Sequence, residues 1–423
     1  MSEVRDPLQV EFGAELEGLR LVRQAPPAGS ASFSATYVGP AGWGRDPSGR
    51  EGLAQLTCHL MACATRRLDR VALARFLDHA GGTLSHEASP ESAELTVWGP
   101  ESSREELIGL LADVVLRPRF APDDLARIRR QLHERQLRER TQPASRAERE
   151  LLASIYPHGH PYRETGLGTP RSVARIDADD LRRFHRDQYT SGDAILVVTT
   201  SAPLPIVERQ ARRLFAEFER AAPPSIGPIP APGGRPGERI VPLPGRSQVE
   251  VRIGGVSIGR GDPAYPAAFL ANEILGGRPL LSRLFQRVRE RGGLAYHASS
   301  SLEAMRLGGY WVAQAGTGSD RWRKVVPMVA EEIDRLRARP PPPGLLRTIR
   351  ESAIGELPLG LETTAEAHDL AVDVAYLGLP GDYWKRWPAV LRAVTGPDVA
   401  RAAEVALDRR RAVTVVVGPV ERR

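Results

Sequence analysis

Hydrophobic positions at helical and strand spacing divide the chain into short elements. Between residues 107 and 115, leucine, isoleucine and valine recur three or four positions apart, and this spacing predicts an amphipathic helix. Ser103 and Glu106 form a capping-box pattern at its start, and Pro118 follows its end. Pro122 stands where a first-turn proline is favoured, which predicts the start of a second, arginine-rich helix.

Other stretches are short runs of β-branched and apolar residues, and such runs predict strands. They do not alternate regularly with the helical stretches, as they would in a parallel sheet built from β-α-β units. We therefore predict an α+β fold in which mainly antiparallel sheets are covered by helices. The predicted strands are residues 32–38, 93–98, 194–199, 249–253, 309–315 and 412–417.

The two halves of the chain resemble each other. The Gly-Gly pair at 81–82 is followed by His86, and the same pattern returns as a Gly-Gly pair at 292–293 followed by His297. A Pro- and Gly-rich stretch that favours neither a helix nor a central strand separates the halves. Matches in the same order predict a duplicated unit. The predicted organisation is an N-terminal domain at 1–220, a linker at 221–238 and a C-terminal domain at 239–423.

The composition is that of an ordinary globular protein. Of 423 residues, 41% are hydrophobic and 26% are charged, which excludes a wholly disordered or coiled-coil chain. The net charge of +6 comes from arginines interleaved with acids, as in residues 127–140. This pattern is typical of a solvated helix, so no nucleic-acid partner is expected. No apolar run approaches the ~18 residues that a membrane span needs, so no membrane partner is expected either.

The expected location is cytoplasmic. The N-terminus carries acidic residues and no apolar segment, and it therefore shows no signal-peptide pattern. The two cysteines, Cys58 and Cys63, are too few to staple a chain of this length, which fits a reducing compartment.

Several motifs occur in order along both halves of the chain. The first is residues 51–60, with the sequence Glu-Gly-Leu-Ala-Gln-Leu-Thr-Cys-His-Leu. Together the motifs resemble the zinc metallopeptidases of the pitrilysin and mitochondrial-processing-peptidase family, the inverzincins. The resemblance covers nearly the whole chain and implies two homologous halves with the architecture of a metallopeptidase clamshell half. The other motifs are residues 76–82, 116–122, 161–170, 180–189, 272–277, 282–285 and 289–296.

The family uses an H-x-x-E-H helix, in which two histidines bind zinc and the glutamate activates water, together with a distal glutamate ligand. The resemblance aligns Gln55 with the first histidine, Cys58 with the glutamate and His59 with the second histidine. An ungapped count aligns the distal ligand with Arg135, although a shift by one residue would offer Glu134. An amide is a poor zinc ligand, a thiol cannot replace a carboxylate base, and a guanidinium repels the cation. The zinc motif is therefore interpreted as degenerate, and no metal or other cofactor is expected in this chain.

The residues that remain at the motif leave one alternative open. Cys58, His59 and Cys63 are close in sequence and His133 is a further candidate, so a divergent metallo-enzyme could use Cys58 and His59. The sequence favours a small buried cysteine and a histidine satisfied within its helix, because it identifies no local group that would activate the thiol.

One functional pair of the family is retained. The resemblance implies that an arginine and a tyrosine of the C-terminal half serve the zinc site, the arginine by holding the peptide and the tyrosine by stabilising the oxyanion. Arg289 and Tyr296 match this pair in type and spacing.

The family also contains heterodimers in which one subunit holds the zinc and the other supplies this pair. The resemblance therefore implies a non-catalytic subunit of a heterodimeric zinc peptidase. An active homologous partner would carry the zinc, and Arg289 and Tyr296 would act in trans on its peptide substrate. We expect little or no peptidase activity from the chain alone. A catalytically dead scaffold or a peptide-binding homodimer is the other alternative.

Overall fold

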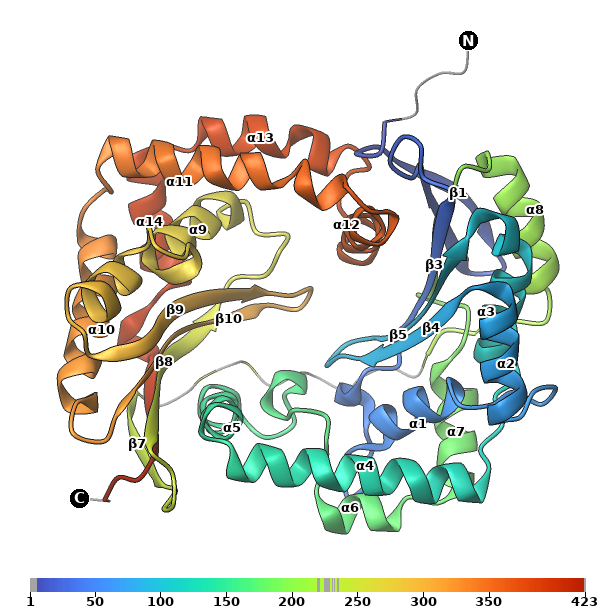
Figure 1. The fold of residues 1–423 in the computed structure, drawn as a ribbon, viewed down its shortest axis with the longest axis horizontal. Helices are drawn as coiled ribbons and strands as arrows, with labels where there is room; N and C mark the ends of the chain where they lie inside the picture. Colours follow the sequence, from blue (N-terminus) through green and yellow to red (C-terminus); the bar gives the residue numbers. More distant parts are fainter. Residues whose placement is uncertain are drawn as a thin grey trace. The chain divides into compact units, whose positions relative to one another are not determined.

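The structure contains helices together with two β-sheets (Figure 1). It is a computed structural model that describes residues 6–218, 221–223, 229, 231, 233 and 236–421. One sheet has six strands and the other has five, so the predicted α+β fold is confirmed. All six predicted strands are present, with small shifts at their ends. No helix within these ranges is long and apolar enough to cross a membrane.

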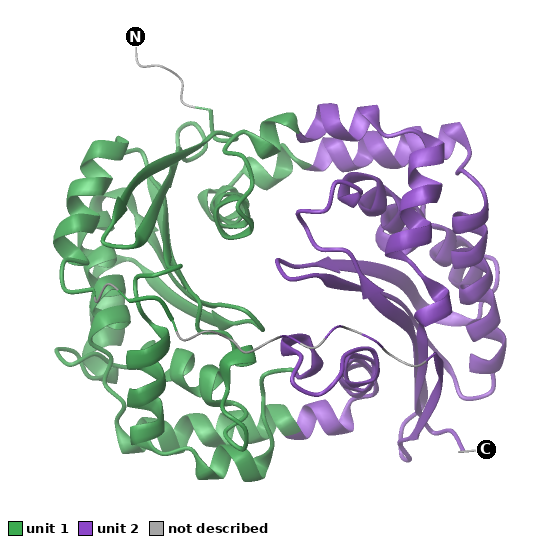
Figure 2. Ribbon diagram, turned by 180° about the vertical axis from the view of Figure 1, so that it is seen from behind, with its two compact units in different colours: residues 1–136, 165–228, 357–386 green, residues 137–164, 229–356, 387–423 purple. Residues whose placement is uncertain are grey.

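The chain divides into two compact units, each assembled from three segments (Figure 2). Unit 1 comprises residues 1–136, 165–228 and 357–386, and unit 2 comprises residues 137–164, 229–356 and 387–423. Each unit therefore combines segments from both halves of the sequence. The domain boundaries at 220 and 239 stay a prediction, and much of the predicted linker at 221–238 lies outside the described residues.

The sheet of unit 1 is mixed. Its strand order is β1-β2-β6-β3-β5-β4, in which β2 and β6 pair in parallel and the other neighbours pair antiparallel. Strand β4 therefore lies at one edge. The strands are β1 (Val10–Leu16), β2 (Leu19–Gln24), β3 (Ser32–Gly39), β4 (Thr83–Ala88), β5 (Ala93–Pro100) and β6 (Ile195–Thr199).

The uninterrupted apolar run of β6 reflects burial on both faces of this sheet. Leu196 and Val198 belong to the buried cluster that contains the leucines of α3, whereas Ile195 and Val197 cluster with α12. A strand that is covered on both sides gains from apolar residues at every position. The helices of unit 1 are α1 (Leu53–Met61), α2 (Arg70–Ala80), α3 (Arg104–Leu116), α6 (Pro170–Arg175), α7 (Ala178–Gln188), α8 (Leu204–Leu214) and α12 (Thr364–Leu377).

Helix α3 confirms the predicted helix at 107–115 and extends it at both ends. The predicted capping box is wrong, because Ser103 makes no capping hydrogen bond with its side chain. Ser103 instead closes a 3-10 turn, η2 (Glu101–Ser103), that leads directly into the helix. The predicted arginine-rich helix is α4 (Pro122–Thr141), whose residues fall in both units.

The sheet of unit 2 has the order β7-β11-β8-β10-β9, in which β7 and β11 pair in parallel and the other neighbours pair antiparallel. Apolar residues of α5 (Pro143–Ile155) pack in one cluster with valines of β10 and β11. A helix from the first half of the sequence thus completes this core, as α12 from the second half does in unit 1. The strands are β7 (Gly237–Pro242), β8 (Gln248–Ser257), β9 (Ala295–Ala304), β10 (Gly309–Gly318) and β11 (Val413–Gly418).

Five further helices and two π-helical turns complete the part of unit 2 that bears on the site. The helices are α9 (Tyr265–Asn272), α10 (Trp322–Ala338), α11 (Pro343–Glu356), α13 (Tyr383–Ala393), which begins in unit 1, and α14 (Gly396–Ala406). The π-helical turns are η4 (Glu273–Gly277) and η5 (Phe285–Glu290).

Candidate functional site

Helix α1 carries three of the four residues that align with the family's zinc motif. Gly52 adopts a left-handed conformation (φ 99°) that turns the chain into the helix. The Asp46 carboxylate accepts hydrogen bonds from the backbone N–H groups of Gly52 and Ala54, each at 2.7 Å. Asp46 therefore caps the helix from outside it, and the helix that follows is buried at eight of its nine positions.

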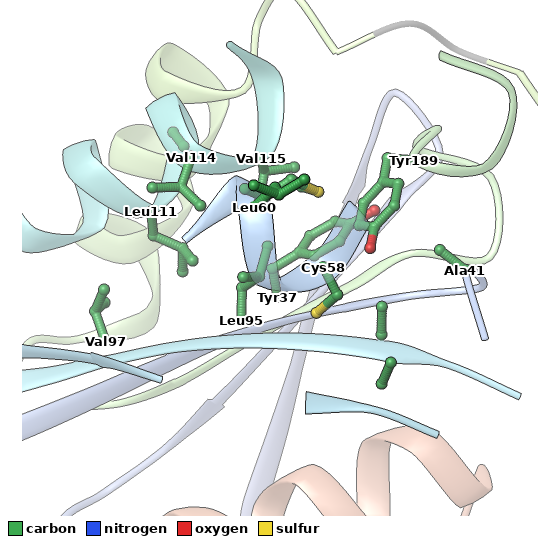
Figure 3. Close-up of a cluster of buried hydrophobic side chains, with 14 of the residues drawn as sticks. Tyr37, Ala41, Cys58, Leu60, Leu95, Val97, Leu111, Val114, Val115 and Tyr189 are labelled. Atoms are coloured by element: carbon green, nitrogen blue, oxygen red, sulfur yellow. The ribbon is translucent and has the colours of Figure 1, made fainter. Parts of the chain in front are cut away.

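The side chain of Cys58 lies in the hydrophobic core of unit 1, beside Tyr37 and Tyr189 (Figure 3). Its thiol donates a hydrogen bond to the carbonyl oxygen of Glu87 at 3.4 Å. Burial raises the pKa of the thiol to about 12. Only the thiolate form of cysteine is reactive or binds metal, and a thiol with so high a pKa stays protonated at pH 7. Cys58 therefore serves the packing of the core.

His59 has different neighbours. Its ring centroid lies 4.3 Å from that of His86 on β4. Burial lowers the pKa of His59 to about 4, and the nearby positive charges of Arg127 and Arg135 act in the same direction. Burial and the charge of Arg135 also lower the pKa of His86. Both imidazoles are therefore neutral at pH 7 and lie within the field of the Arg135 guanidinium.

Cys63 does not join Cys58 in a common site. Its thiol donates a hydrogen bond to the carbonyl oxygen of His59 at 3.3 Å, and Nη2 of Arg127 lies 3.2 Å from its sulfur. Burial raises the pKa of this thiol as well, and both cysteines are free. His133 is exposed on α4 and makes no ring, ion-pair or hydrogen-bond contact with the motif among the residues described.

These residues do not fit a zinc ion. Within the described part of the chain, no group of three or more His, Cys, Asp or Glu side chains is placed to hold a metal. The aligned positions present a neutral amide, a protonated thiol, one imidazole and a cation, and a zinc ion beside Arg135 would face a like charge. Cys58 and His59 are adjacent on α1 and contact different neighbours. The geometry therefore gives no support to a metallo-enzyme built on these two residues.

The retained arginine and tyrosine lie in unit 2, on either side of a turn. Arg289 is the next-to-last residue of η5 and Tyr296 is the second residue of β9, and the turn between these elements contains Gly293 in a left-handed conformation (φ 57°). The Arg289 guanidinium lies over the ring of Phe285, 5.0 Å from its centroid, and Tyr296 is 64% exposed. Among the described residues, neither side chain has a hydrogen-bond or ion-pair partner. Both are accessible to a second molecule.

Two contributors to this region could not be assigned from the sequence. His86 was visible only as part of the internal repeat, and its contact with His59 depends on how β4 pairs with β5. Asp46 lies well before α1 and has no helix-capping spacing. For His86, the one sequence signal was its repetition as His297 in the second half of the chain.

Comparisons with known proteins match most of the chain to a single family. Residues 23–166 match the family described as "Insulinase (Peptidase family M16)", and residues 175–352 match "Peptidase M16 inactive domain". A Mycobacterium leprae protein named an uncharacterized zinc protease is 27% identical over 348 residues, which span 82% of this chain and 77% of that protein.

Solved structures have the same fold. A structure described as the peptidase M16 inactive domain from Pseudomonas fluorescens has a TM-score of 0.91 at 23% identity and covers 97% of this chain and 98% of that chain. A protease from Helicobacter pylori has a TM-score of 0.89 at 16% identity and covers 97% of this chain and 99% of that chain. The two-sheet architecture is therefore shared along almost the full length.

Proposed function

The chain belongs to the M16 peptidase family, and from this premise we propose that it is a non-catalytic subunit of a heterodimeric zinc peptidase. In this proposal a homologous partner binds the zinc ion and cleaves the peptide. Arg289 and Tyr296 of this chain complete the partner's site.

The observation that carries the proposal is the contrast between two parts of the chain. The aligned zinc positions hold residues that do not fit the metal, and Cys58 is packed into the core. By contrast, the side chains of Arg289 and Tyr296 are exposed and have no hydrogen-bond partner among the described residues. A chain that served only as an inert scaffold would have no need to keep this pair exposed and unpaired.

The chemistry suits a role in trans. A tyrosine hydroxyl can donate a hydrogen bond to the oxyanion that forms when water attacks a peptide carbonyl. An arginine can hold a peptide carbonyl or carboxylate through charge-assisted hydrogen bonds. The zinc, the ligands and the water-activating carboxylate would belong to the partner, and a cytoplasmic location stays part of the proposal.

The test begins with the chain purified from an overexpressing strain and, separately, with the chain captured from its native host. We expect the isolated chain to cleave no peptide in a chelator-sensitive manner and to bind no stoichiometric zinc. We expect the captured sample to contain a homologue with an intact H-x-x-E-H helix and to cleave peptides until a chelator is added.

Two outcomes would contradict the proposal. Chelator-sensitive cleavage by the isolated chain would show that the chain is itself a peptidase. Capture of a zinc-binding homologue whose turnover is the same with and without this chain would favour the scaffold alternative, as would a stable homodimer with no such homologue.

A further inference from the structure

A cavity of about 630 Å³ lies within unit 1. One of its lining residues, Tyr189, also lies beside Cys58 in the core (Figure 3). Its walls come from the end of α3, the segment that leads into α4, helix α7 and the residues just after α8. The volume falls in the range of about 300–1,000 Å³ that small-molecule sites occupy. The aligned zinc positions, Arg289 and Tyr296 do not line it, although the lining includes residues of the motifs at 116–122 and 180–189.

The floor of the cavity is aromatic. The ring of His185 lies edge-on to Phe120 at 5.9 Å and stacks on Tyr189 at 5.4 Å between centroids. Nε2 of His185 lies 2.7 Å from the carbonyl oxygen of Val115, which fixes the proton on this nitrogen because a carbonyl can only accept. Burial lowers the pKa of His185, so the ring is neutral at pH 7 and its Nδ1 carries no proton.

The rim of the cavity is cationic. Four arginines line it, namely Arg66, Arg119, Arg182 and Arg186. Arg182 and Arg186 pair with carboxylates of their own helix, Asp179 and Asp187.

Arg66 and Arg119 have no carboxylate at ion-pair distance among the described residues. The one acidic residue of the lining is Glu217, and its carboxylate is held by Arg117 at 2.6 Å. The lining therefore carries a net positive charge, and in the described part of the chain two of its guanidinium groups form no ion pair. An anion would find charge-assisted hydrogen bonds at the rim, and an apolar body would find an aromatic floor below it.

We propose that this cavity binds a small organic anion, in which a carboxylate, phosphate or sulfonate is attached to an aromatic or other apolar body. Arg66 and Arg119 hold the anionic group. Phe120, His185 and Tyr189 contact the apolar body, and Nδ1 of His185 accepts a hydrogen bond from a ligand hydroxyl or N–H where the ligand has one.

The test compares two fluorescent probes of nearly the same shape, anilinonaphthalene sulfonate and the uncharged phenylnaphthylamine, on the full chain. We expect the sulfonate to bind saturably at one site, and to bind more weakly as salt is added because its charge is screened. Arg66→Gln and Arg119→Gln should each weaken sulfonate binding about tenfold, the value of one charge-assisted hydrogen bond. Neither substitution should change the affinity of the uncharged probe.

Arg130→Gln is the matched control, because Arg130 is an exposed arginine of α4 that does not line the cavity. A second experiment uses Ala121→Trp, whose larger side chain fills the cavity and should exclude both probes. All variants are checked for an unchanged melting temperature.

Equal affinity for the two probes would overturn the proposal, and so would an equal loss of sulfonate binding in Arg130→Gln. Sulfonate binding that survives in the folded Ala121→Trp variant would place the probe elsewhere and overturn it too.

Discussion

His368 and Thr36 are 332 positions apart, yet Nε2 of the histidine lies 2.7 Å from the threonine hydroxyl. Nδ1 of the same ring lies 2.8 Å from the hydroxyl of Thr199. His368 therefore joins α12 to two strands of the unit 1 sheet, β3 and β6, at a position that is only 2% exposed. A neutral imidazole has one donor and one acceptor, and these two contacts use both.

The first prediction is that His368→Ala destabilises the chain. The substitution leaves a cavity under α12 and removes two hydrogen bonds of buried hydroxyl groups. We expect a loss of about 2–4 kcal/mol in the free energy of unfolding. Urea unfolding followed by circular dichroism measures it, and His158→Ala, at an exposed loop histidine, is the control. Equal urea midpoints for wild type and His368→Ala would contradict the conclusion that His368 stabilises the packing of α12 on the sheet.

The second prediction concerns the pH dependence of that stability. Burial lowers the pKa of His368 to about 3, below the value of about 6.5 for an unfolded histidine. Between these values the unfolded chain binds a proton that the native chain does not, so stability is lost as the pH falls through this window. One such group contributes a slope of about 1.4 kcal/mol per pH unit.

We therefore expect His368→Leu, which cannot titrate, to lose less stability than wild type between pH 7 and pH 5. Urea midpoints at the two pH values measure the difference. His158→Leu should keep the wild-type dependence, and a wild-type dependence in His368→Leu would mean that this histidine is not the buried neutral group described.

The third prediction is that the cysteines are unreactive in the native chain. Burial raises the pKa of both thiols, to about 12 for Cys58, so the thiolate needed for attack on a disulfide reagent is scarce at pH 7.5. A chromogenic disulfide reagent should label neither thiol until urea unfolds the chain. Cys63→Ser isolates the signal of Cys58, and Cys58→Ser isolates that of Cys63. Fast labelling of native Cys63→Ser would contradict the packing of Cys58 in the core.

The secondary structure of the chain could be predicted from its local sequence more fully than its packing. The apolar run at 194–199 correctly predicted β6, because a strand buried on both faces needs apolar residues throughout. What covers its second face could not be predicted, since α12 comes from the opposite end of the chain. The capping box at Ser103 failed because its pattern ignores the 3-10 turn that precedes the helix.

In the candidate site, too, the local sequence predicts the helix positions of the residues but not their tertiary contacts. Helical spacing is enough to place Gln55 and His59 on one face of α1, and the small size of Cys58 fits its burial. The proximity of Arg135 to His59 and His86, by contrast, arises from the tertiary contact of three separate elements. No local pattern contains that information, and the family alignment supplied the position of Arg135 instead.

The fourth prediction tests that alignment by restoring a metal site. Gln55→His combined with Arg135→Glu would add an imidazole and a carboxylate to the imidazole of His59. Three such groups suffice for zinc. We expect the double variant to bind one zinc ion per chain, as measured by calorimetry and metal analysis. Each single variant should bind less than one, because one ligand is missing or a cation remains. The double variant should not cleave peptides, since Cys58 still occupies the position of the general base.

Failure of the folded double variant to bind zinc would show that Arg135 does not occupy the place of the distal ligand. A neighbouring residue would then align with the distal ligand, and Glu134 is the first residue to test. Equal zinc binding by wild type and the double variant would contradict the conclusion that the present residues do not fit the metal.

The last prediction addresses Arg289 and Tyr296 in the complex captured from the native host. Tyr296→Phe removes one exposed hydroxyl, so the fold and the association of the subunits should remain intact. Loss of one oxyanion donor should lower kcat by about 10²–10³. Arg289→Ala should raise KM through weaker peptide binding, and Arg289→Lys should recover only part of it, because an ammonium lacks the two-pronged geometry of the guanidinium. Arg291→Ala, at an exposed arginine of the same turn, should leave both constants unchanged. If turnover is unaffected by Tyr296→Phe and by Arg289→Ala in complexes of normal melting temperature, the pair is structural and the role in trans is wrong.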